Sequence, residues 1–146
     1  MKKTIITQLN EEEQELAKMA IEAISLSYSP YSHYSVGAAV KLSNGKMVKG
    51  ANQENVSYPV GICAERSTLA TAQNLYPNVP VTAIALAASA KGKALTPDIV
   101  TPCGMCRQAL LECENRFNNN IKIIMLSANE VLVAESVKEL LPAAFS

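Results

Sequence analysis

Three cysteines and one glutamate, in two short clusters, are the residues of this chain whose types and spacing suggest chemistry. Cys63 and Glu65 lie in Cys-Ala-Glu, and Cys103 and Cys106 lie in Pro-Cys-Gly-Met-Cys. Thiolates are good zinc ligands, and a structural zinc site normally closes with four protein ligands. Three ligands leave one position open for water, and a nearby carboxylate can then move protons. The pattern therefore predicts a catalytic zinc site rather than a structural one.

Of the two further side chains that could in principle be ligands, Cys113 is too far away and His33 is a weak candidate. Cys113 follows Cys103 by ten residues on the same predicted helix, which is about 15 Å along the helix axis. We expect Cys113 to be a buried apolar residue. His33, the single histidine, could be a fourth ligand, although packing or hydrogen bonding is the more usual role. The remaining alternatives are three unrelated buried cysteines and a redox role for the Cys-x-x-Cys pair.

Positive groups are expected near the sulfurs, because three thiolates outweigh the charge of one Zn²⁺ ion. Cys63 and Cys103 both fall at predicted helix starts, where free N–H groups and the helix dipole favour a thiolate. Arg66 follows Cys63 by three residues and so shares its helix face. We predict that Arg66 hydrogen-bonds the ligand sulfurs. Arg107 is a weaker candidate for the same role.

Local signals place several of the elements that must position these clusters. Asn10 followed by Glu13 predicts a capping box at the start of the first helix. The segment 43–45, Ser-Asn-Gly, predicts a β-hairpin turn because Asn and Gly both tolerate positive φ. Ser136 with Glu139 predicts a second capping box, at the start of a short last helix.

Apolar periodicity predicts the element order α-β-β-α-β-α-β-β-α. The helices are expected at residues 10–28, 63–75, 103–117 and directly after 136. The strands are expected at residues 34–42, 46–51, 81–88, 121–126 and 131–134, with loops at 52–62 and 91–101. This order predicts an α/β fold, in which one five-stranded sheet carries helices on both faces within a single domain, 1–146.

Composition argues against nucleic acid or a membrane as the main partner. The chain has 146 residues, 49% of them hydrophobic, and 13 basic residues balance 13 acidic ones. A net charge near zero does not favour polyanion binding. No apolar run approaches the ~20 residues of a membrane span, and the N-terminal residues do not form a signal peptide. We therefore expect a cytoplasmic protein whose cysteines stay reduced.

Five segments in this order resemble the small, homotetrameric, zinc-dependent cytidine deaminases of the cytidine/deoxycytidylate deaminase superfamily. The segments are residues 29–39, 50–55, 58–66, 102–108 and 139–145. The resemblance covers nearly the whole chain. It implies a three-layer α/β/α sandwich with a mixed five-stranded central sheet, and a homotetramer with active sites near the subunit interfaces.

The resemblance also assigns the metal and the sugar. It implies that Cys63, Cys103 and Cys106 bind zinc and that Glu65 is the proton shuttle. It further implies that two residues of the 52–62 loop, Asn52 and Glu54, hold the ribose hydroxyls, chiefly the 3′-OH.

Four other residues are implied to contact the nucleoside. Backbone groups of Ala64 and Thr101 would meet the pyrimidine, and Phe145 would reach an active site across a subunit boundary. Tyr34 stands where the family usually has Phe beside the nucleoside, so this chain keeps the ring and adds a hydroxyl.

The implied activity is hydrolytic deamination of cytidine and 2′-deoxycytidine to uridine and 2′-deoxyuridine, with release of ammonia, as in pyrimidine salvage. A Glu54 carboxylate would accept sugar hydroxyls and repel a phosphate on the same sugar, which favours a free nucleoside. Three alternatives remain. They are a deaminase of a related nucleoside such as blasticidin S, a non-catalytic zinc module with four protein ligands, and an RNA- or DNA-editing deaminase with a basic groove.

Overall fold

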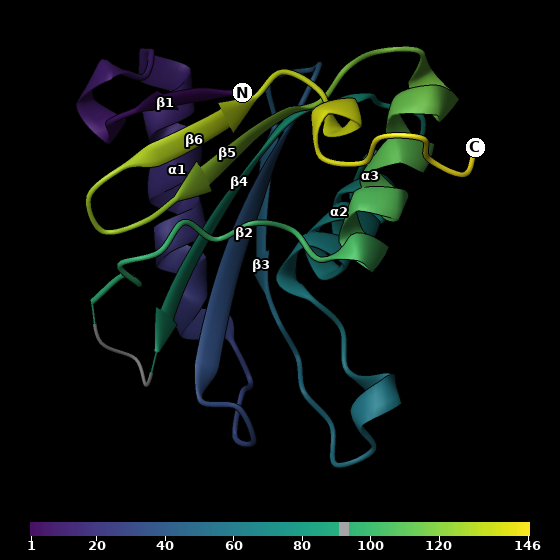
Figure 1. Ribbon diagram of the computed structural model, residues 1–146. Helices are drawn as coiled ribbons and strands as arrows, with labels where there is room; N and C mark the ends of the chain where they lie inside the picture. Colours follow the sequence, from purple (N-terminus) through teal and green to yellow (C-terminus); the bar gives the residue numbers. More distant parts are fainter. Residues whose placement is uncertain (91–93) are drawn as a thin grey trace.

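The computed structural model of the chain describes residues 1–90 and 94–146 as one sheet with helices on both faces (Figure 1). The strand order is β1-β6-β5-β4-β2-β3, and only the β4–β5 pair is parallel. The strands are β1 Lys2–Thr4, β2 Tyr34–Leu42, β3 Met47–Ala51, β4 Val81–Ala90, β5 Lys122–Leu126 and β6 Val131–Ala134. The helices are α1 Glu11–Ala23, α2 Ala64–Leu75 and α3 Gly104–Phe117.

The expected α/β fold with a mixed sheet is confirmed, but the predicted count of five strands is wrong because the described chain has six. The additional strand is β1, in which Lys2 pairs with Val133 and Thr4 pairs with Val131 of β6. Lys-Lys-Thr has no apolar alternation to mark it as a strand. This segment forms a strand because it pairs with backbone groups of β6 that would otherwise be unpaired at the edge of the sheet.

Helix α1 covers one face of the sheet, and it begins as predicted. Glu13 N–H donates to the Asn10 side chain at 2.9 Å and Asn10 N–H donates to the Glu13 carboxylate at 3.1 Å, which completes the capping box. The helix ends at Ala23, earlier than expected, and Ile24–Leu26 tightens into a 3₁₀ turn. Its backbone lies directly on β2, where a Cβ added to Gly37 would be only 2.1 Å from the Ala20 carbonyl oxygen.

Helices α2 and α3 cover the other face, and their positions match the prediction to within one residue at each start. Cys63 and Cys103 are the N-cap residues of these two helices. Helix α3 ends at Phe117, and its C-cap residue Asn118 adopts the left-handed conformation with φ 49°. Because β4 and β5 are parallel, the connecting helix α3 has to start at the carboxyl end of β4.

The predicted β-hairpin is confirmed by the antiparallel pairing of β2 with β3 and by the φ of 86° at Gly45. The predicted loop at 91–101 is irregular over residues 94–101 apart from a bridge between Leu95 and Ser89. Its residues 91–93 lie outside the described residues.

The expected last helix is wrong, because Val137–Glu139 makes a single 3₁₀ turn. Ser136 accepts from Lys138 N–H at 3.2 Å, and the Glu139 carboxylate accepts from Glu135 N–H at 2.7 Å, so the predicted capping box does not form. Instead the Ser136 hydroxyl donates to the buried carboxylate of Glu114 at 2.8 Å. That tertiary bond outweighs the local helix signal.

No helix within residues 1–90 and 94–146 is both long enough and apolar enough to cross a membrane.

Candidate active site

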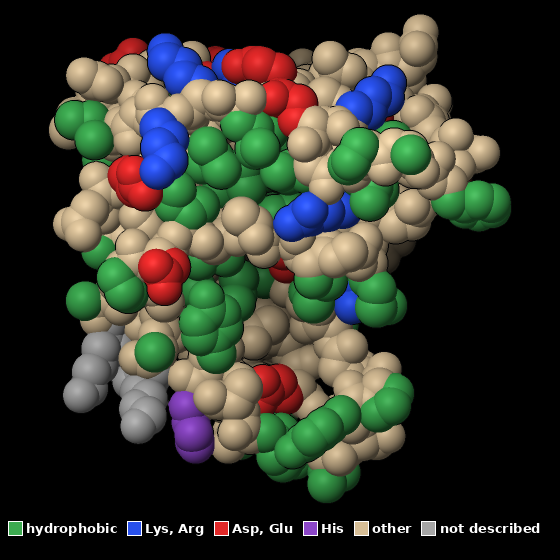
Figure 2. Space-filling view, in the orientation of Figure 1, with side chains coloured by type: hydrophobic (Ala, Val, Ile, Leu, Met, Phe, Trp, Pro, Cys, Tyr) green, Lys and Arg blue, Asp and Glu red, His purple; other side chains and the backbone are tan. Residues whose placement is uncertain are grey.

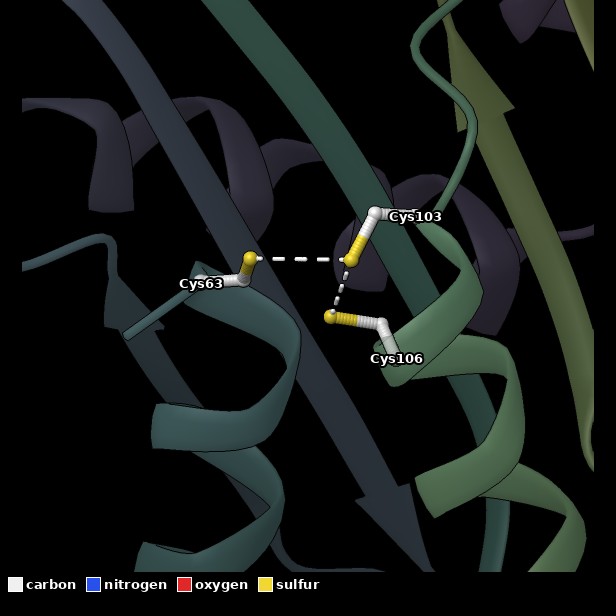
Figure 3. Close-up of side chains that lie close together, drawn as sticks. All are labelled: Cys63, Cys103 and Cys106. Atoms are coloured by element: carbon white, nitrogen blue, oxygen red, sulfur yellow. Dashed lines mark hydrogen bonds between the residues drawn. The ribbon is translucent and has the colours of Figure 1, made fainter. Parts of the chain in front are cut away.

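Three thiols meet where the starts of α2 and α3 face each other (Figure 3). The Sγ atoms of Cys63 and Cys103 are 3.8 Å apart, those of Cys103 and Cys106 are 3.5 Å apart, and all three lie within 4.8 Å of one another. Zinc–sulfur bonds of about 2.3 Å in a tetrahedron place two sulfurs about 3.8 Å apart. The thiols are free, and their spacing fits one zinc ion with little movement.

The other two candidate ligands are not part of this cluster. Among the described residues, Cys63, Cys103 and Cys106 are the one group of three or more side chains that could hold a metal together. Cys113 is buried as expected, and burial raises the pKa of its thiol. His33 sits in the left-handed region with φ 54°. Within the described residues the cluster thus offers three possible ligands, one fewer than a closed tetrahedral site needs.

Arg66 lies beside the sulfurs and helps to stabilise negative charge there. One terminal guanidinium nitrogen is 3.9 Å from the Cys63 sulfur. A hydrogen bond from the Cys106 thiol, together with bonds from Arg66 and Cys103, lowers the pKa of Cys63 to about 5. The same shared proton, with burial, raises the pKa of Cys106. The cluster of free thiols therefore already stabilises a thiolate at Cys63.

Glu65 is the second residue of α2, and only 5% of its surface is exposed. Burial raises its pKa, and the nearby charge of Cys63 adds to that effect, while hydrogen bonds from its own backbone N–H and from Cys106 oppose it. A carboxyl group whose pKa lies above its ordinary value can both take and give a proton closer to neutral pH. Its position next to a thiol ligand fits the proton shuttle expected from the sequence.

Glu54 lies in the loop between β3 and α2, and three hydrogen bonds orient it. One carboxylate oxygen accepts from the N–H groups of Tyr31 (3.0 Å) and Ser32 (3.1 Å), and the other accepts from the Ser32 hydroxyl (2.5 Å). These bonds, led by that of the hydroxyl, lower the pKa of Glu54. A carboxylate can accept about four hydrogen bonds, so room remains for a ligand hydroxyl.

A pocket of about 420 Å³ opens at Glu54, between the body of the protein and the loop that follows β3. The space-filling view shows this loop standing out at lower right with a hollow above it (Figure 2). The lining residues are Tyr31, Ser32, Glu54, Asn55, Tyr58 and Gly61. The rings of Tyr31 and Tyr58 touch edge to face with centroids 5.7 Å apart. Among the described residues that line the pocket there is no Lys or Arg, so none of these side chains favours a phosphate.

Asn52 is held mainly by the protein itself. Its side-chain oxygen accepts from the Ser27 hydroxyl (2.5 Å) and from Val36 N–H (2.9 Å), and its amide nitrogen donates to the Tyr34 carbonyl (2.9 Å). An amide NH₂ has two donors, so one N–H remains for a ligand. The network also fixes the start of β2, to which Tyr34 belongs.

The remaining predicted contact residues are placed differently. Ala64 is buried in the first turn of α2, and Thr101 is exposed just before Pro102. Tyr34 is 40% exposed, and the Phe145 ring projects from the chain with 87% of its surface exposed.

Sequence reasoning missed one residue of the site, Ser32. Its hydroxyl donates to Glu54 and accepts from Tyr34 N–H at 3.0 Å, and so it connects two of the expected substrate contacts. The available signal was its position inside the 29–39 segment of the resemblance. A serine in a loop carries no periodic pattern, so its partner in the other loop could not be inferred.

Comparison with known proteins identifies the family. The family described as "Cytidine and deoxycytidylate deaminase zinc-binding region" matches residues 10–118. A cytidine deaminase of Halalkalibacterium halodurans is 38% identical over 134 residues, which are 91% of this chain and 93% of that protein. The zinc-binding character of the matched region agrees with a site made of three thiols.

Solved structures agree with this assignment. The crystal structure of cytidine deaminase from Burkholderia pseudomallei matches with a TM-score of 0.76 and 31% identity, covering 94% of this chain and all (100%) of that chain. That of cytidine deaminase from Mycobacterium tuberculosis matches with a TM-score of 0.72 and 30% identity, covering 94% and 99%. This chain therefore belongs to the cytidine and deoxycytidylate deaminase family.

Proposed function

We propose that this protein is a zinc-dependent cytidine deaminase that hydrolyses cytidine and 2′-deoxycytidine to uridine and 2′-deoxyuridine with release of ammonia. The observation that carries the proposal is a cluster of three thiols, spaced for one tetrahedral zinc ion, next to a buried glutamic acid. Relatives named as cytidine deaminases support it. Cys63, Cys103 and Cys106 are the proposed ligands, and zinc, when bound, supplies a Lewis acid that lowers the pKa of water toward about 7.

Glu65 moves the protons of the reaction. It takes a proton from the attacking water and delivers it to N3 of the pyrimidine while the water oxygen bonds to C4. It then transfers the second proton of the water to the 4-amino group. The C4–N4 bond breaks, its electron pair leaves with nitrogen as ammonia, and the carbonyl of uracil remains. The raised pKa of this buried carboxyl suits both the giving and the taking of a proton.

Glu54 and Asn52 hold the ribose, chiefly its 3′-OH. The Glu54 carboxylate is oriented by three hydrogen bonds and retains acceptor capacity, and Asn52 retains one amide N–H. A free nucleoside is favoured over a nucleotide because the described residues that line the pocket beside Glu54 include a carboxylate and no cation.

Backbone groups of Ala64 and Thr101 contact the pyrimidine, and the Tyr34 ring lies beside the nucleoside. Arg66 offsets the excess negative charge of the thiolates, as its contact with Cys63 supports. Phe145 completes the site of a neighbouring subunit.

The proposed assembly is a homotetramer of single-domain chains, 1–146, in the cytoplasm, with active sites near the subunit interfaces. Exposed apolar side chains support an assembly: Val56 is 78% exposed, Tyr58 74%, Val60 64% and Phe145 87%. The reducing cytoplasm keeps thiol ligands available for a metal.

Ultraviolet monitoring of cytidine conversion, with and without a zinc chelator, tests the function. Full-chain protein with one zinc per chain should convert cytidine to uridine with release of ammonia, and chelation should stop the reaction until zinc is restored. Faster turnover of blasticidin S than of cytidine would refute the substrate assignment. Activity that persists in metal-free protein would refute the role of zinc.

A further inference from the structure

Arg107, which directly follows the third thiol, joins two segments that are far apart in the sequence. Its Nε donates to the Pro102 carbonyl at 2.7 Å, and a terminal guanidinium nitrogen donates to the Leu140 carbonyl at 2.7 Å. The guanidinium is planar, so these two donors have a fixed relative direction. One side chain therefore sets the distance between the loop before Cys103 and the C-terminal segment.

The guanidinium of Arg107 is occupied by carbonyl groups rather than by acids or sulfurs. No carboxylate in the described part of the chain lies within salt-bridge distance of it. The arginine that contacts a ligand sulfur is Arg66. The expected charge-balancing role of Arg107 is therefore replaced by a geometric one.

Gln108 adds a second attachment for the last residues of the chain, 140–146, which we call the tail. Its side-chain amide donates to the Phe145 carbonyl at 2.8 Å. Between the two attachments the tail bends at Ala143, which has a φ of 51°. Leu141 and Ala144 pack against the hydrophobic core between the sheet and helices α2 and α3. Consecutive residues in the first turn of α3 thus hold the tail at points five residues apart.

The other end of α3 holds the segment that leads into the tail. Glu114 is 3% exposed, and its carboxylate accepts from the Ser136 hydroxyl at 2.8 Å and from Val137 N–H at 2.9 Å. The helix that carries two of the thiols is therefore also the support of the C-terminal segment (Figure 1). After these attachments Phe145 remains 87% exposed, so hydrogen bonds to the backbone, and not burial of the ring, hold this end of the chain in place.

We propose that Arg107 and Gln108 are positioning residues, which lock the tail to the loop of the thiol site so that Phe145 is presented to the active site of a neighbouring subunit. This role rests on the proposed function and assembly. It predicts that substrate affinity depends on two residues that touch neither substrate nor metal. Loss of Arg107 releases both the tail and the backbone at Pro102, next to the pyrimidine contact proposed for Thr101.

Hydrogen–deuterium exchange of the zinc-loaded full chain tests the attachment directly. Arg107→Ala should increase the exchange of residues 140–145 while zinc content stays at the wild-type level. Arg116→Ala is the matched control, because Arg116 lies on the same helix and donates to half-buried Gln73 and exposed Asn78 rather than to the tail. Unchanged tail exchange in Arg107→Ala would overturn the proposal. If Arg107→Ala fails to fold, Gln108→Ala provides the same test, because it removes only the bond to the Phe145 carbonyl and should also increase tail exchange.

A double-mutant cycle tests whether the attachment acts through Phe145. Arg107→Ala and Phe145→Ala should each raise KM, with a loss of kcat/KM of about 10- to 100-fold, and the double variant should be no worse than the poorer single variant. Arg107→Lys should recover part of the lost kcat/KM, since lysine can donate to one carbonyl but cannot hold both in a fixed direction. Effects that multiply in the double variant would show that Arg107 does not act through Phe145. A wild-type chain that does not deaminate cytidine would refute the proposed function, whereas the exchange result stands independently of activity.

Discussion

Replacing Glu65 with Gln should remove the proposed proton transfer while leaving the shape of the site almost unchanged. The side chain is 5% exposed, so bulk water cannot take over its role. One positioned general acid or base contributes about 10²–10⁴-fold to a rate, and in the proposed mechanism Glu65 serves both N3 and the leaving amino group. We therefore expect kcat to fall by at least about 10⁴-fold, which corresponds to about 5.4 kcal/mol in the activation free energy.

The assay is the loss of cytidine absorbance in the ultraviolet, measured together with zinc content and thermal denaturation. Zinc content should stay at one per chain, because none of the three thiols changes. KM should change little, since the amide occupies the space of the carboxyl group. Glu15→Gln is the matched control, because Glu15 is an exposed glutamate on α1, on the opposite face of the sheet. Near-normal turnover in Glu65→Gln would refute the shuttle role, and loss of zinc would show that Glu65 instead retains the metal.

Four further outcomes are expected. Chelation should abolish activity and lower the melting temperature, since a metal that binds only the folded state stabilises it, and restored zinc should reverse both. Arg66→Gln should weaken zinc affinity or activity by about 10- to 100-fold, measured by competition with a chromogenic chelator, whereas unchanged values would exclude its role at the sulfurs. Hydrogen bonds hold the pKa of Glu54 below its ordinary 4.5, so this carboxylate stays ionised until the pH falls through that lowered pKa. The contribution of Glu54 to stability and to substrate binding is therefore lost only below that pH. Ser32→Ala should raise KM and move the acid limb of the pH–KM profile upward; an unmoved limb would contradict the network. Gly37→Ala should destabilise the fold by at least about 1–3 kcal/mol in thermal denaturation, because the new Cβ would lie 2.1 Å from a backbone oxygen of α1. Gly104→Ala is the control and should melt like wild type, because its Cβ would meet none of the surrounding atoms within 4 Å.

The strongest parts of the sequence interpretation depended on residues close together in the chain. The capping box at Asn10 and Glu13 and the hairpin turn at Gly45 both formed, because each needs only neighbouring residues. The prediction for Ser136 and Glu139 used the same logic and was wrong. There the buried carboxylate of Glu114 binds Ser136 and Val137, a competitor far away in the sequence.

The site divides in the same way. Spacing alone singled out Cys63, Cys103 and Cys106 as ligands and excluded Cys113 by helix arithmetic. Spacing could not show that the three thiols lie close together, because this depends on two helices packing side by side on one face of the sheet. The hydrogen bond from Ser32 to Glu54 could not be predicted from the sequence either, since it joins two loops.

The sequence by itself determined the chemistry of this protein: which side chains can bind zinc, which carboxyl can move a proton, and which elements carry them. The chemistry that a side chain can perform depends on its residue type and on its spacing from neighbouring side chains, and the sequence contains both. Only the tertiary structure decided that β1 closes the edge of β6 and that Arg107 turns from the sulfurs to the carbonyls of Pro102 and Leu140. Those outcomes depend on which backbone groups remain unpaired after the sheet and helices have packed.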